Sequence, residues 1–175
     1  NLHFAYLKKE IEIETITLDH FKKEQNIDKF DFIKLDVQGA ELDILNGASN
    51  SLKDVTFIIS EVEFIQLYID QPLFSDICSY LKSEDIEFHK FLNLSGRSLK
   101  PITFNNNLNF ATQHVWSDAI FTKNITQFGK LSCDQLLKLA IFMFIYESPD
   151  LSYFCLNIYD ARNKTKTTEI LKKVL

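Results

Sequence analysis

Two short runs of residues are apolar on both sides of the strand they would form, and they constrain the fold more than any other feature. These runs are FIKLDV (residues 32–37) and VTFIISEV (residues 55–62). Strands of this kind belong in a sheet that is covered on both faces, which is the usual setting of parallel strands. A helix is expected between them over residues 40–46, with Gly47 as a left-handed residue at its end. The sequence therefore predicts an α/β fold with right-handed crossovers.

The neighbouring segments extend this pattern. Residues 11–18 (IEIETITL) alternate apolar and polar side chains, which is typical of a half-buried strand, and Thr17 can then cap a short helix. A further helix is expected to begin at Gln71-Pro72, with proline at its first position. Strands are expected over residues 87–94 and 115–122. Because no helix separates these last two strands, they should be antiparallel.

The end of the chain is helical in character. Ser132 and Gln135 have the spacing of a capping box in front of an apolar helix, and Pro149 begins a second helix. These helices are compatible with a lid, an interface or a separate hairpin. We therefore expect an α/β domain over residues 1–128 and a helical extension over residues 129–175.

Composition excludes several classes of partner. The formal net charge of -5 offers no basic face for nucleic acid. The three cysteines are far apart and show no CxxC spacing, so neither a zinc site nor a disulfide framework is indicated, and free thiols in a reducing cytoplasm are expected. The longest apolar run, residues 139–146, is far shorter than the roughly 20 residues of a membrane span. We therefore expect no nucleic acid and no membrane among the partners.

Residues 31–47 (DFIKLDVQGAELDILNG) contain the strongest candidates for chemistry. Asp36 ends a buried strand, at the edge where open parallel sheets bind ligands. Gln38 lies on the same side as Asp36, and Gly39 allows close approach of a ligand to the backbone. Glu41 falls in the first turn of the next helix, where the helix dipole favours an anion. The alternative is that Asp36 and Glu41 only cap a strand-to-helix turn.

Lys34 is unusual because it interrupts an apolar strand on the same face as Asp36. A buried lysine needs a partner, and the candidates are Asp36 and a carboxylate of the neighbouring strand, Glu61 or Glu63. The pair would be either structural or functional.

Other candidates lie around the last strand. His114 is a candidate general base, although a lone histidine at a strand start is more often structural. Trp116 is a candidate for stacking on a sugar, with core packing as the alternative. Asp118 either contributes to the site or bonds neighbouring backbone amides. An oxygen-rich metal site is a further alternative, formed by four residues: Asp36, Glu41, Glu61 and His114. Their spacing carries no metal signature, so no metal is expected.

The stretch DFIKLDVQGAELDILNGA resembles the signature of FkbM-type methyltransferases, through Lys34, Asp36, Gln38, Gly39 and Glu41. Three further segments are similar to that family in the same order, namely TITLDHF, SEVEFIQLY and WSDAIFTK. The resemblance covers about residues 14–123 and does not extend to the helices that follow.

The resemblance implies a Rossmann-like class I methyltransferase fold with S-adenosylmethionine (AdoMet) as the methyl donor. It implies transfer to a hydroxyl oxygen of a small molecule or glycan. Asp36, Gln38 and Gly39 are then the expected donor-binding residues, and Asp36 or His114 is the expected base. The acceptor is expected to meet four residues: Glu41, Glu61, Trp116 and Asp118.

One part of the family pattern is missing from the sequence. The four glycines are dispersed and form no Gly-rich donor-binding loop. We therefore expect the chain to be the C-terminal part of such an enzyme, inactive alone, with one sheet edge exposed. Homo-oligomers would use that edge or the C-terminal helices. The alternative function is a non-catalytic interaction or oligomerisation domain that retains the fold.

Overall fold

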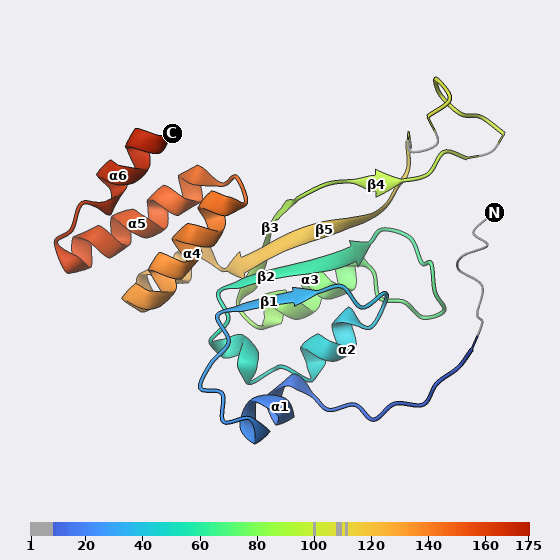
Figure 1. Ribbon diagram of the computed structural model, residues 1–175, viewed down its shortest axis with the longest axis horizontal. Coiled ribbons are helices and arrows are strands. Elements are labelled where there is room, and N and C mark those ends of the chain that lie inside the picture. Colours follow the sequence, from blue (N-terminus) through green and yellow to red (C-terminus); the bar gives the residue numbers. More distant parts are fainter. Residues whose placement is uncertain (1–8, 100, 108–109, 111) are drawn as a thin grey trace.

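The computed structural model describes residues 9–99, 101–107, 110 and 112–175. Its centre is a sheet with the strand order β1-β2-β5-β3, and a short β4 pairs with β5 (Figure 1). The strands are β1 (Phe32–Leu35), β2 (Phe57–Glu63), β3 (Ile86–Phe91), β4 (Ser95–Gly96) and β5 (His114–Lys123). β1 and β2 are parallel, whereas β5 is antiparallel to both β2 and β3. The prediction of a mixed α/β sheet with an antiparallel closing strand is confirmed.

Helices cover both faces of this sheet (Figure 1). They are α1 (Leu18–Glu24), α2 (Glu41–Asn46), α3 (Phe74–Ser83), α4 (Cys133–Ile145), α5 (Pro149–Asn163) and α6 (Thr167–Val174), with 3-10 helices η2 (Ser51–Lys53) and η3 (Ile125–Lys130). On one face, Ile33 and Leu35 of β1 share a core with Leu45 of α2 and Leu81 of α3. This double cover explains why β1 and β2 are apolar on both sides.

The C-terminal helices cover the second face. Phe57 of β2 is fully buried there, and its ring stacks on Phe142 of α4 at a centroid distance of 4.9 Å. The predicted capping box is present at the start of α4, where Ser132 and Gln135 bond each other's backbone amides. Pro149 is the first residue of α5, as predicted. Because these helices share a core with the sheet, they are not a separate hairpin.

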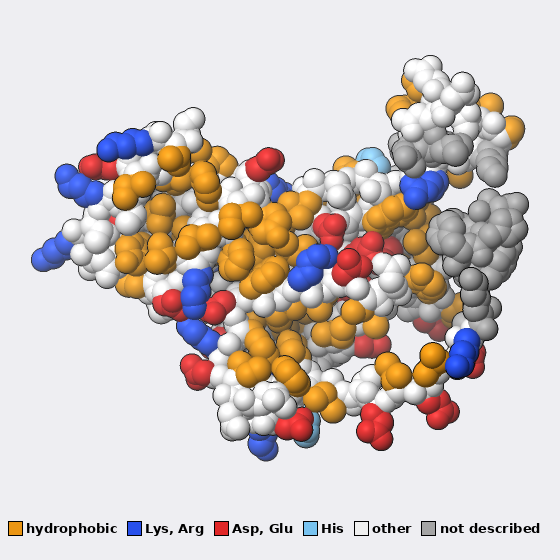
Figure 2. Space-filling view, in the orientation of Figure 1, with side chains coloured by type: hydrophobic (Ala, Val, Ile, Leu, Met, Phe, Trp, Pro, Cys, Tyr) orange, Lys and Arg blue, Asp and Glu red, His pale blue; other side chains and the backbone are white. Residues whose placement is uncertain are grey.

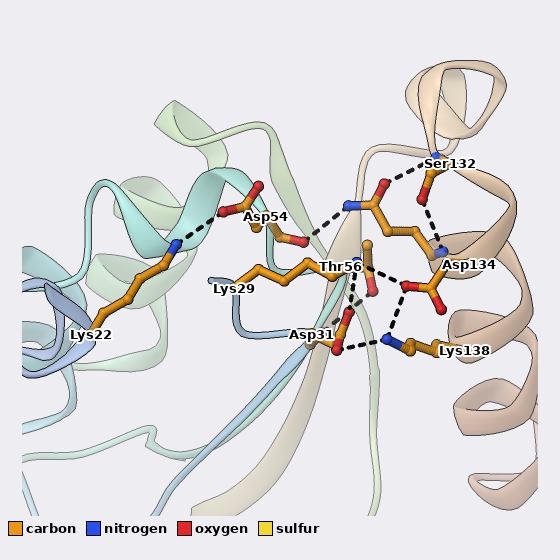
Figure 3. Close-up of polar contacts among 9 residues, drawn as sticks. Lys22, Lys29, Asp31, Asp54, Thr56, Ser132, Asp134 and Lys138 are labelled. Atoms are coloured by element: carbon orange, nitrogen blue, oxygen red, sulfur yellow. Dashed lines mark hydrogen bonds and ion pairs between the residues drawn. The ribbon is translucent and has the colours of Figure 1, made fainter. Parts of the chain in front are cut away.

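Ionic contacts reinforce this packing at the amino end of β1. Lys138 of α4 lies 2.9 Å from Asp31 and 2.9 Å from Asp134, and Lys29 lies 2.8 Å from Asp134. Figure 3 shows these side chains converging from α4 and from the loop before β1. We call Lys29, Asp31, Asp134 and Lys138 the docking cluster. Its position indicates a structural role, which is to hold α4 against the sheet.

The predicted strand over residues 11–18 is wrong. The structure has irregular chain there, and then α1 begins at Leu18. Ile11 and Ile13 are largely exposed, so their alternation with polar residues does not reflect a buried face. The predicted cap is correct, since the Thr17 hydroxyl accepts from the backbone N–H of His20 at 3.1 Å.

Two predictions about helix ends also fail. Gly47 follows α2 with φ -80° and is therefore not left-handed. Its lack of a side chain matters for another reason, because a Cβ at this position would lie 3.0 Å from the Cβ of Thr17. Pro72 precedes α3 by two residues instead of opening it, and the α3 N-terminus is capped by Asp76, whose carboxylate accepts from the N–H of Leu73.

Two features bear on partners. β1 ends the strand order, so its outer edge is unpaired within the residues that the structure describes. Across those same residues, no helix combines the length and the apolarity that crossing a membrane requires.

Candidate active site

The candidate site lies where β1 and β2 end, because side chains on one face of the sheet change there from apolar to charged. On this face, Phe57 and Ile59 of β2 lie in the core with the C-terminal helices. Glu61 is the next residue of β2 on the same face, and in the register of the sheet it lies opposite Asp118 of β5. Lys34 of β1 is paired with Ile59 in the register. The three strands β1, β2 and β5 therefore bring the charges of Lys34, Glu61 and Asp118 to one edge of the sheet.

A hydrogen-bonded network joins these charges. The Nζ of Lys34 donates to Asp118 Oδ1 at 3.1 Å and to Asp36 Oδ2 at 3.5 Å. The amide nitrogen of Gln38 donates to Asp36 Oδ1 at 3.3 Å and to Glu61 Oε2 at 2.6 Å. We call Lys34, Asp36, Gln38, Glu61 and Asp118 the acidic edge. It contains three carboxylates against one lysine.

The structure corrects part of the Lys34 prediction. Asp36 is a partner, as expected, but the second partner is Asp118 instead of Glu61 or Glu63. The lysine is also not buried, since 44% of its side chain is exposed. Partial burial lowers the pKa of Lys34, but the hydrogen bond and charge of Asp118 and the charge of Asp36 outweigh it and raise the pKa above its usual value. Lys34 therefore stays cationic.

Glu41 holds the turn between β1 and α2. Its carboxylate is 1% exposed and accepts from the backbone N–H groups of Val37 and Gly39, both at 2.9 Å. Gln38 and Gly39 have φ values of 57° and 112°, and the turn needs these left-handed conformations. The capping alternative therefore describes Glu41 well. It does not describe Asp36, whose side chain is 55% exposed and belongs to the network of the acidic edge.

From the sequence, Glu63 was considered only as a partner for Lys34 and was not among the predicted site residues, although it lies beside this turn. It is the last residue of β2 and is only 4% exposed. Burial raises its pKa from 4.5 to about 7, and the negative charges of Glu41 and Glu61 add to the rise. The pKa of Glu61 is also raised, by burial and then by the charge of Asp36. The signal in the sequence was the alternation S-E-V-E at the end of a buried strand, which places both glutamates on one face.

Gln71 connects this region to the loop before α3. The oxygen of its side-chain amide, Oε1, accepts from the backbone N–H groups of Leu67 and Tyr68, at 2.8 and 3.2 Å. Its amide nitrogen is 3.3 Å from the position that a Cβ on Gly39 would occupy. A side chain at Gly39 would therefore press on Gln71. Close packing thus favours glycine at this position, in addition to its positive φ.

The structure places His114 and Trp116 further along β5. Trp116 is paired with Glu63, and the guanidinium of Arg97 lies 5.1 Å from its ring centroid. His114 pairs with Gly96 of β4 and is four residues before Asp118, which is roughly 13 Å along an extended strand. The structure therefore brings Asp118 to the acidic edge but does not bring His114 there.

A metal site receives no support from the geometry. Within the described part of the chain, no three or more histidine, cysteine, aspartate or glutamate side chains are arranged to hold an ion. The four residues considered for such a site are separated by role: Glu41 is buried in the turn, Asp36 and Glu61 share Gln38, and His114 lies apart.

Fold and site together define an α/β protein whose charged, accessible residues lie at the carboxyl edge of parallel strands, where this class binds its ligands. Residues 2–88 match the model of the methyltransferase FkbM domain, which places this part of the chain in that family. The match includes Asp36, Gln38, Glu41 and both glutamates at the end of β2.

Two characterised relatives are similar to the chain. The 2-O-methyltransferase NoeI of Sinorhizobium fredii is 34% identical over 43% of this chain and 31% of its own length. The hexuronic acid methyltransferase AglP of Haloferax volcanii is 30% identical over 42% of this chain and 34% of its own length. The matched part thus spans about a third of each relative. No solved structure gives a significant match.

Proposed function

We propose that this chain forms the acceptor side of an AdoMet-dependent O-methyltransferase that acts on a hydroxyl group of a small molecule or glycan. The observation that carries the proposal is the acidic edge, where three carboxylates and one lysine meet at the carboxyl ends of β1 and β2. Keeping unbalanced charge at a strand edge costs stability, and such arrangements concentrate at functional sites.

The sheet order supports the same proposal. Two parallel strands followed by an antiparallel strand inserted beside them is the arrangement expected for the C-terminal part of a Rossmann-like class I methyltransferase. The names of the two relatives, a 2-O-methyltransferase and a hexuronic acid methyltransferase, support a sugar hydroxyl as the acceptor.

The residues at the acidic edge fit AdoMet in their charge. When bound, AdoMet supplies an electrophilic methyl group on a sulfonium cation, and a net negative edge favours a cation. Asp36 and Gln38 would hold the donor, and Gly39 would let it approach the backbone. The edge is open to solvent on the described residues, so the remaining walls of the donor site would come from elsewhere in the protein.

Asp36 is the base in this proposal. Its carboxylate is accessible, and Lys34 and Gln38 hold one oxygen each in a fixed orientation. It would take the proton of the acceptor hydroxyl as the new bond to carbon forms. Lys34 is the orienting group, since it also fixes Asp118 and thereby spaces the two carboxylates. His114 lies too far along β5 to share this task in the described conformation.

The test is methyl transfer from isotopically labelled AdoMet to a panel of sugars that includes hexuronic acids, using the protein in the full length that its gene encodes. We expect label in an O-methyl group of the product. Absence of AdoMet binding in calorimetry, or transfer of label to nitrogen or sulfur, would contradict the proposal. Failure to bind AdoMet would instead favour the non-catalytic interaction domain.

A further inference from the structure

The C-terminal helices present an apolar groove on the side that faces away from the sheet. The groove has a volume of about 270 Å³, and α4, α5 and α6 all contribute to it. On α4 it is lined by Leu137, Ile141 and Phe144, and on α6 by Ile170 and Val174. This surface serves no purpose in the packing already described, because the sheet is covered by the opposite side of α4.

The rim of the groove exposes large aliphatic side chains to water. Ile170 and Val174 of α6 are 64% and 65% exposed, and Ile141 of α4 is 51% exposed. Figure 2 shows hydrophobic side chains gathered over these helices in one broad patch. An apolar patch of this kind on a folded protein marks an interaction surface.

The same region carries positive charge. Residues 160–173 contain five Lys or Arg and two acids, whereas the whole chain has a net charge of -5. One of the two acids, Asp160, is occupied by hydrogen bonds from Thr165, Thr167 and Thr168. On α6, helical periodicity places Lys173 beside the stripe formed by Ile170 and Val174 and Lys172 on the other side of the helix, where its Nζ lies 5.0 Å from the ring centroid of Tyr153.

We propose that the groove face of α4 and α6 docks on an anionic membrane surface. An exposed apolar face in a lysine-rich helical segment is the pattern of a helix that lies in the interface of a bilayer, with lysine stems extending toward lipid headgroups. A second copy of the chain fits this surface less well. A two-fold dimer would bring the basic segment of one copy against the same segment of the other.

The expectation of no membrane partner was based on the lack of a spanning segment, and interfacial docking needs no span. The arrangement of the molecule is compatible with docking. In Figure 1 the strands β1 and β2 point away from α5 and α6, so the carboxyl ends of these strands, where the acidic edge lies, are directed away from those helices. A docked chain would keep its negative edge away from a negative surface.

The experiment is co-sedimentation of the full chain with two kinds of vesicle. One is pure phosphatidylcholine, and the other contains about 30% phosphatidylserine, which is enough to set a negative surface potential. Two variants test the two parts of the surface: Ile170→Asp for the apolar rim, and Lys166→Gln with Lys173→Gln for the charge. Matched controls are Ile69→Asp, which is exposed on a loop elsewhere, and Lys23→Gln with Lys82→Gln, which lie on α1 and α3.

We expect binding to the anionic vesicles that is at least about tenfold weaker in each test variant, is unchanged in the controls and falls with added salt. Circular dichroism confirms that each variant is folded. Equal binding to neutral vesicles, or equal binding by Ile170→Asp, would overturn the proposal. A concentration-dependent dimer in sedimentation velocity that Ile170→Asp abolishes, without vesicle binding, would assign the surface to a second copy.

Discussion

Two ionic clusters lie at opposite ends of β1, and they are built on different principles. The docking cluster at the amino end contains two lysines and two aspartates, so its charges balance. The acidic edge at the carboxyl end contains one lysine and three carboxylates, with Glu41 and Glu63 buried close behind. The docking cluster joins helix α4 to the sheet. The acidic edge links only strands of the sheet and the turn after β1, which the sheet already holds together.

The pKa shifts of the carboxyl groups in the two regions have opposite signs. In the docking cluster, hydrogen bonds from Lys29 and Lys138 lower the pKa of Asp134, and the pKa values of both lysines are raised. Folding therefore favours the charged forms there. For Glu61 of the acidic edge and Glu63 behind it, burial and like charges raise the pKa values, so folding disfavours their charged forms. Charge imbalance, not the number of ion pairs, separates a candidate site from a structural contact.

The largest difference between the clusters should appear in activity. Asp36→Asn removes the base of the proposed reaction, and we expect the rate of methyl transfer to fall by about 10²–10⁴-fold. Asp31→Asn is the matched control, since it makes the same change in the docking cluster and should retain the rate. Initial rates with labelled AdoMet measure both variants, with circular dichroism as a check of folding. A wild-type rate for Asp36→Asn would remove Asp36 from the mechanism.

The second effect is on stability and concerns the turn behind the acidic edge. Glu41→Ala leaves the N–H groups of Val37 and Gly39 without their acceptor in a partly buried turn. We expect a loss of about 2–3 kcal/mol in the free energy of unfolding, measured by urea denaturation. Asp43→Ala changes an exposed acid of the same helical turn and should cost far less. Equal losses would mean that the dipole of α2, not the hydrogen bonds, accounts for the effect.

The third effect is a pH dependence due to Glu63. Its pKa is about 7 in the folded chain against a usual 4.5, so between these values the folded state binds more protons than the unfolded state. Its contribution to stability is complete below pH 4.5 and is lost as the pH rises through 7. We expect a loss of about 1–2 kcal/mol over this range, after allowance for solvent screening.

Glu63→Gln should remove most of that slope. Urea midpoints at pH 5 and pH 8 measure it, and Glu24→Gln, on the exposed surface of α1, serves as the control. A slope that persists in Glu63→Gln would show that another group titrates over this range.

The sequence predicted the parts of this structure that follow from local pattern. The strands β1 and β2, the capping box of α4 and the cap that Thr17 provides for α1 each follow from residues adjacent in sequence, and all are confirmed. The failure at residues 11–17 has the same origin, because alternation alone does not reveal whether a neighbouring strand is present.

Contacts between residues far apart in the sequence could not be predicted from local pattern. The choice of Asp118 as the partner of Lys34 depends on β5 entering the sheet next to β2, and nothing near either residue encodes that order. The burial of Glu63 likewise depends on contacts that the fold creates, so its alternation with Glu61 was visible in the sequence but its pKa shift was not.

The smallest effect should come from the docking cluster, and salt sharpens the contrast. Lys138→Gln removes the bonds to Asp31 and Asp134 at a site that is partly open to water, so we expect the melting temperature to fall by no more than about 2 °C. In 1 M NaCl this difference should vanish, because exposed attractive pairs are screened.

Salt should act in the opposite direction at the acidic edge, where it screens repulsion between Glu61 and its acidic neighbours. Glu61→Gln should therefore raise the melting temperature at low salt and lose that advantage at high salt. If both variants respond to salt with the same sign, the distinction between a balanced and an unbalanced cluster does not hold.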